Sequence, residues 1–96
     1  MCPIILSPEM TAKLGTKHQV LLIEVRQCFE NITGEYVEEI RVRHKTNPPT
    51  YWFLSETNNE RLLKIVFVQR DGNLFIKTAY EPNAAEIELY KKLSPE

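Results

Sequence analysis

Residues 61–80 read RLLKIVFVQRDGNLFIKTAY, and this stretch decides the fold. Two runs rich in β-branched and aromatic residues flank Asp71-Gly72, which is the strongest short-range signal for a β-hairpin. A two-residue turn at this pair sets the register of the two strands. The predicted pairs are Arg70 with Asn73, Val68 with Phe75, Phe67 with Ile76, Val66 with Lys77, and Lys64 with Ala79.

The predicted register divides the hairpin side chains between two faces. One face is almost entirely apolar and is the predicted core face; it carries Leu63, Ile65, Phe67, Leu74, Ile76 and Thr78. The opposite face mixes apolar residues with three cations; it carries Lys64, Val66, Val68, Arg70, Phe75, Lys77 and Ala79. We expect a partner, a ligand or the chain's own termini to cover part of this mixed face.

Two helices are predicted before the hairpin. Ser7 is a typical N-cap followed by proline, and the first helix is expected to end at Gly15. A second helix ends near Asn31 and packs its apolar stripe on the core face of the hairpin. The stripe consists of Leu22, Val25, Cys28, Phe29 and Ile32. Residues 1–6 are expected to be extended or frayed.

Two further strands and a last helix complete the prediction. Residues 36–43 alternate in the manner of a strand, and residues 51–54 form another short strand after a pair of prolines. Asn83 and Glu86 fit a capping box that opens the last helix. The sequence therefore predicts one α+β domain over residues 1–96, in the order ααββββα, with a four-stranded antiparallel meander.

Composition restricts the possible classes of function. The chain has 96 residues, is 43% hydrophobic and has a net charge of -1. It has no apolar run near the roughly 20 residues that span a bilayer, and residues 1–6 do not fit a signal peptide, so we expect a cytoplasmic protein without a membrane partner. The two cysteines and two histidines lack metal-site spacing, so we expect reduced thiols, no metal and no cofactor. A nucleic-acid role would require a local basic patch.

Four short motifs carry a family resemblance through their order and spacing. They are Lys17-His18 before the second helix, Arg61-Leu62-Leu63 at the start of the hairpin, Thr78-Ala79 at its end, and Tyr90 in the last helix. In these features the chain after Lys13 resembles the BrnT-type ribonuclease toxins of the RelE superfamily. The resemblance implies a RelE-like fold, RNA cleavage and an antitoxin partner. The chain departs from that family at Tyr80, where an arginine is usual, and in its acidic last helix.

The region from His44 to Phe53 also resembles uncharacterised bacterial proteins, some of which carry the name ADP-ribosyl-(dinitrogen reductase) hydrolase. Those hydrolases hold paired metals with clustered aspartates. Asp71 is the only aspartate in this chain. We therefore reject that chemistry for this sequence.

Metal-independent RNA cleavage needs a base, an acid and cations that stabilise the developing charge on phosphorus. The candidate catalytic residues are His44 as base or acid, Lys77 as a cation, and Tyr80 as a proton donor or stacking ring. The candidate substrate-binding residues are Arg41, Arg43, Lys45, Lys64 and Trp52. The missing arginine at Tyr80 predicts slow cleavage.

Each candidate also has a structural interpretation. His44 fits a surface turn, residues 41–45 fit a solvated strand face, and Tyr80 fits a half-buried packing position. His18 is interpreted as a residue that caps or packs at the entrance of the second helix. Two functional classes therefore remain open: a weak endoribonuclease of toxin–antitoxin type, and a non-catalytic protein-binding module of the same fold. The sequence does not predict an oligomeric state.

Overall fold

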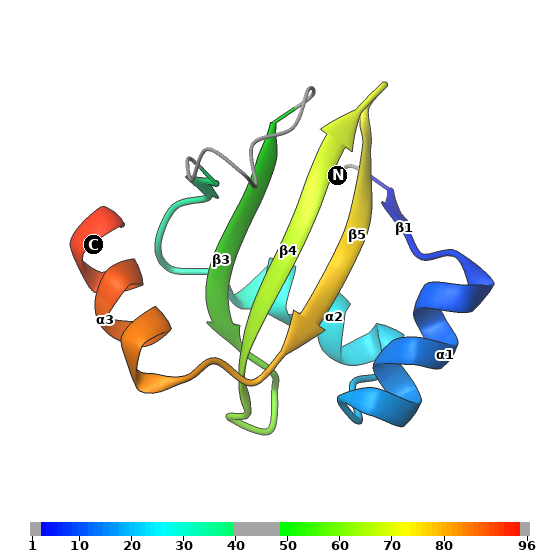
Figure 1. The fold of residues 1–96 in the computed structure, drawn as a ribbon, viewed down its shortest axis with the longest axis horizontal. Helices are drawn as coiled ribbons and strands as arrows, with labels where there is room; N and C mark the ends of the chain where they lie inside the picture. Colours follow the sequence, from blue (N-terminus) through cyan, green and yellow to red (C-terminus); the bar gives the residue numbers. More distant parts are fainter. Residues whose placement is uncertain (1–2, 40–48, 95–96) are drawn as a thin grey trace.

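A computed structural model of the chain describes residues 3–39 and 49–94 (Figure 1). Within these residues it has three helices and five strands. In chain order the elements are β1 (Ile4–Ile5), α1 (Pro8–Lys17), α2 (Leu22–Asn31), β2 (Val37–Glu38), β3 (Thr50–Glu56), β4 (Leu62–Arg70), β5 (Asn73–Tyr80) and α3 (Ala84–Leu93). The α+β class that the sequence predicts is therefore confirmed.

The sheet has five strands in the order β1-β5-β4-β3-β2, so the prediction of four purely antiparallel strands is wrong in detail. Strands β2 to β5 do form the predicted antiparallel meander. The fifth strand, β1, runs parallel to β5 and places Ile4 opposite Leu74. The physical reason is that β5 would otherwise be an open edge, and the N-terminal segment supplies hydrogen-bond partners for it.

The hairpin turn agrees with the prediction, because Asp71 and Gly72 have φ values of 53° and 79°. Positive φ at both central residues is typical of a type I′ turn. The pairs near the turn follow the predicted register as far as Phe67 and Ile76. Beyond that point a β-bulge leaves Lys77 as an extra residue, so Val66 pairs with Thr78 and not with Lys77.

The bulge exchanges the faces of the residues that follow it. Ala79 pairs with Ile65 and is fully buried, whereas the prediction had placed it on the mixed face. Thr78 is half-buried on the mixed face, so its predicted core position is wrong. Tyr80 pairs with Lys64, which brings its ring to the mixed face as well.

The core lies between the sheet and α2, which crosses behind the sheet in Figure 1. Val25 and Cys28 of α2 are fully buried, as the apolar stripe predicts, although Leu22 is 36% exposed. Aromatic rings from four parts of the chain meet here, with ring centroids 4.8–6.2 Å apart. They belong to Phe29, Tyr36, Phe53 and Phe67.

Local capping signals place the starts of α1 and α3. The Ser7 hydroxyl accepts from the Met10 N–H and begins α1, and Asn83 and Glu86 form both bonds of the predicted capping box in α3. Helix α1 continues through Gly15 to Lys17, so the predicted end at Gly15 is wrong. Of the strand predicted over 36–43, residues 40–43 lie outside the described part of the chain. Among the described residues, no helix is both long and apolar enough to cross a bilayer.

Candidate functional site

A hollow of about 480 Å³ lies on the mixed face of the sheet, beside the C-terminal end of α1. It gathers side chains from α1, β3, β4 and β5. Its lining consists of Lys13, Lys17, His18, Glu39, Thr50, Trp52, Lys64, Val66, Lys77, Thr78 and Tyr80. Four lysines and a histidine face one glutamate in this lining. We call this concavity the cationic hollow.

Four of the predicted site residues meet in the cationic hollow. Lys64, Lys77, Tyr80 and Trp52 all line it, although they come from three strands. The other four predicted residues, Arg41, Arg43, His44 and Lys45, lie outside the described residues. A second hollow, of about 610 Å³, is larger, but Lys91 is its single lysine among the described residues. We therefore place the candidate site in the cationic hollow.

The floor of the cationic hollow is a neutralised cluster. The Lys64 ammonium lies 2.8 Å from Glu86 Oε2, and the Tyr80 hydroxyl donates to the same oxygen at 2.7 Å. Lys64 also lies 4.6 Å from the centroid of the Trp52 ring. The Lys64 residue is only 7% exposed. The charge of Lys64 is therefore already balanced by Glu86, and the Tyr80 proton is directed at a carboxylate.

The Glu86 carboxylate is held in its charged form. Its partial burial raises its pKa, but hydrogen bonds from Lys64, the Asn83 backbone and Tyr80 outweigh burial, so the net pKa is lower than usual. Trp52 is 4% exposed, and its ring contacts both the Lys64 ammonium and the Tyr90 ring, whose centroid lies 5.5 Å from its own. In this arrangement the Trp52 ring is enclosed and does not offer a face to a ligand.

The rim of the cationic hollow carries residues that the sequence reasoning did not assign to a site. Lys13 and Lys17 are four residues apart on α1 and therefore lie on the same face of the helix. His18 caps that helix, and its ring centroid lies 5.6 Å from that of Tyr80. The i,i+4 lysines and the adjacent histidine were visible in the sequence. Their proximity to β5 was not, because it depends on how α1 packs.

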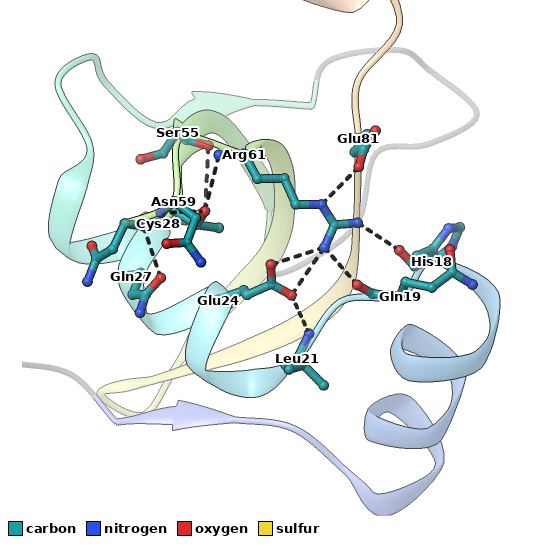
Figure 2. Close-up of polar contacts among 12 residues, drawn as sticks. His18, Gln19, Leu21, Glu24, Gln27, Cys28, Ser55, Asn59, Arg61 and Glu81 are labelled. Carbon is teal, nitrogen blue, oxygen red and sulfur yellow. Dashed lines mark hydrogen bonds and ion pairs between the residues drawn. The ribbon is translucent and has the colours of Figure 1, made fainter.

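Arg61, which immediately precedes β4, fastens this rim to the sheet (Figure 2). Its Nη2 and Nη1 groups donate to the backbone oxygens of His18 at 3.1 Å and of Gln19 at 2.7 Å. Its Nη1 also bonds both carboxylate oxygens of Glu24 at 3.0–3.1 Å, and its Nε bonds Glu81 at 2.8 Å. One guanidinium thus joins the α1–α2 connection, the start of α2 and the chain that follows Tyr80. We call this network the Arg61 clamp.

The Arg61 clamp holds a connection with an unusual backbone conformation. Gln19 has a φ of 52°, in the left-handed region that non-glycine residues rarely adopt. Burial lowers the pKa of the Arg61 guanidinium, but the bonds to Glu81 and Glu24 outweigh burial and raise it above its ordinary value. The clamp thus keeps a permanent positive charge and fixes the place where α1 ends. It also holds the backbone of His18, whose ring lies against that of Tyr80.

Two other observations concern the remaining reactive groups. Burial raises the pKa of the Cys28 thiol to about 12, with a further contribution from the nearby Glu24 charge, so the thiol is neutral. Its Sγ donates to the Ser55 oxygen at 3.5 Å. In residues 3–39 and 49–94, no group of three or more His, Cys, Asp or Glu side chains has a metal-binding arrangement.

Comparisons of this chain with models of protein families, with curated proteins and with solved structures found no match.

Proposed function

We propose that the protein binds single-stranded RNA in the cationic hollow and cleaves it slowly without a metal, in the manner of a toxin of a toxin–antitoxin pair. The observation that carries this proposal is the grouping of Lys13, Lys17, Lys77 and His18 around one concavity. Lysines that surround one concavity can neutralise neighbouring phosphates, and single-stranded RNA is flexible enough to enter a hollow of this size. The resemblance described from the sequence points to the same class of substrate.

The proposed reaction uses the 2′-hydroxyl of RNA as the nucleophile. A base takes the 2′ proton and the 2′ oxygen attacks phosphorus. The bond from phosphorus to the 5′ oxygen then breaks as that oxygen takes a proton from solvent water, which produces a 2′,3′-cyclic phosphate and a free 5′-hydroxyl. We assign the base to His18, which lies at the hollow. The lysines of the rim stabilise the additional negative charge on phosphorus. Tyr80, whose proton goes to Glu86, contributes its ring to the position of His18.

RNA affinities of charge variants test whether the rim lysines of the cationic hollow bind the phosphates. The double variant Lys17→Gln/Lys77→Gln should weaken binding of labelled single-stranded RNA by about tenfold and reduce its salt slope by about 1.4, because each lost phosphate contact removes about 0.7. Lys91→Gln/Lys92→Gln is the matched control, since it removes the same charge from exposed positions in the last turn of α3. Fluorescence anisotropy across a salt series measures both. If both double variants lose the same RNA affinity, RNA binding depends on the overall charge of the protein and not on the cationic hollow.

Cleavage tests the catalytic part of the proposal. His18→Ala should reduce cleavage of RNA by about a hundredfold or more, with binding nearly unchanged, because general base catalysis contributes about 10²–10⁴ in rate. Gel analysis of RNA fragments in the presence of a chelator provides the measurement. His44→Ala is the comparison: if it abolishes cleavage and His18→Ala does not, the base is His44. If the unmodified protein at high concentration leaves RNA intact, the catalytic class is excluded and the non-catalytic protein-binding class remains.

A further inference from the structure

Helix α3 covers part of the mixed face with unusually little apolar contact. None of its residues is fully buried, and Leu89 and Leu93 are 46% and 44% exposed. In Figure 1 it stands at the β3 side of the sheet, away from α2. A helix with so little buried surface is expected to open locally at a low free-energy cost.

Polar contacts at three levels hold α3 in place. At its start, Glu86 binds both Lys64 and Tyr80. In its middle, the Tyr90 hydroxyl donates to the Glu35 oxygen at 2.8 Å, and at its end the Ser94 hydroxyl accepts from the Glu35 N–H. The Glu86 contact is the only ion pair between α3 and the sheet among the described residues.

The sheet face beneath α3 has the composition of a surface for single-stranded nucleic acid. It brings together the indole of Trp52, the phenol ring of Tyr80 and the ammonium of Lys64, which form the floor of the cationic hollow. Aromatic rings that stack on bases, together with cations that contact the backbone, are what such surfaces use. A ligand cannot use these groups while α3 is in place, because the Tyr90 ring packs on Trp52 and the Glu86 carboxylate pairs with Lys64.

We propose that α3 is a displaceable cover, that Glu86 is its latch, and that single-stranded RNA binds the Trp52–Lys64–Tyr80 face when the cover opens. The inference rests on the proposed function and extends the RNA site from the rim of the cationic hollow to its floor, which α3 covers. A backbone phosphate takes the place of the Glu86 carboxylate on Lys64, and a base stacks on Trp52. The fraction of molecules with an open cover then limits the apparent affinity.

Glu86→Gln and Glu88→Gln provide a matched test. Both remove one negative charge from α3, but Glu88 is 68% exposed and pairs only loosely with Lys91, at 3.7 Å. If about one molecule in ten is open, Glu86→Gln should tighten RNA binding by up to about tenfold, whereas Glu88→Gln should change it by less than about twofold. Trp52 is the only tryptophan, so acrylamide quenching of its fluorescence reports on the cover directly. Quenching should increase in Glu86→Gln alone.

The outcomes separate this inference from the proposed function. Unchanged quenching in Glu86→Gln, or equal RNA affinities of the two variants, would overturn the latch and leave RNA binding by the rim lysines intact. Increased quenching without RNA binding by any variant would overturn both the RNA site and the proposed function. If Glu86→Gln does not fold, Tyr90→Phe releases the other end of α3 and should increase both quenching and RNA affinity. No change in either would contradict the inference.

Discussion

Phe67→Ala should destabilise the protein by about 3–5 kcal/mol, which is the range for removal of a buried phenylalanine side chain. Phe67 has no exposed surface, and its ring centroid lies 5.0–5.4 Å from those of Tyr36 and Phe29. Its ring therefore touches α2 and the chain before β2 at once. Since domains have a total stability of about 5–15 kcal/mol, the variant should be close to unfolding at ambient temperature.

Denaturant melts followed by circular dichroism measure this loss. Phe75→Ala is the matched control, because Phe75 lies in the same hairpin but is half-buried on the opposite face, with Arg70 above its ring. The control should lose less than half as much free energy of unfolding. If both variants lose the same free energy of unfolding, the ring cluster around Phe67 contributes no more to stability than the half-buried Phe75.

Arg61→Met should cost about 2–4 kcal/mol, because it keeps the aliphatic part of the side chain but removes every bond of the Arg61 clamp. The bonds to the His18 and Gln19 oxygens and to Glu24 should account for most of the loss, since the Glu24 side chain is 20% exposed. The Glu81 side chain is 64% exposed and should contribute little. The variant should also disturb His18, whose backbone it no longer holds.

Arg70→Met controls for the loss of a positive charge. Arg70 lies at the exposed end of the hairpin, with its Cζ atom 5.0 Å from the centroid of the Phe75 ring. A cation–π interaction at such an exposed site contributes about 0.5–1 kcal/mol. Thermal melts compare the two variants, and NMR shifts of the His18 ring protons report its distance from Tyr80. If Arg61→Met is no less stable than Arg70→Met and leaves the His18 shifts unchanged, Arg61 does not position the rim.

The lysines of the cationic hollow differ in whether a carboxylate already neutralises their charge. A list of lysines from the sequence treats Lys64 and Lys77 as equivalent. The structure distinguishes them, because Lys64 is 7% exposed and paired with Glu86, whereas Lys77 is exposed. Of the four lysines that line the cationic hollow, Lys13, Lys17 and Lys77 are therefore the ones whose charge is available to a phosphate while Glu86 holds Lys64.

The sequence by itself determined the features that depend on a few neighbouring residues. Asp71-Gly72 set the turn because both positions require positive φ, which these residues tolerate. Ser7 begins α1 and Asn83 begins α3 because their side chains accept bonds from N–H groups three residues later. Alternation also placed Phe67 and Ile65 in the core. In the candidate site, the sequence singled out Lys64, Lys77, Tyr80 and Trp52, and the structure brings these four side chains together around the cationic hollow.

Only the tertiary structure decided the features that join distant parts of the chain. Strand β1 forms because β5 offers an open edge. A strand of two residues is too short to show an alternation of apolar and polar side chains, so the sequence did not predict it. The bulge at Lys77 moves Tyr80 to the mixed face, and α1 packs so that His18 reaches it. Glu86 reads as a capping residue in the sequence, yet its second oxygen neutralises Lys64 across the sheet. Pairings of this kind depend on how the elements pack, and no local pattern of residues encodes that packing.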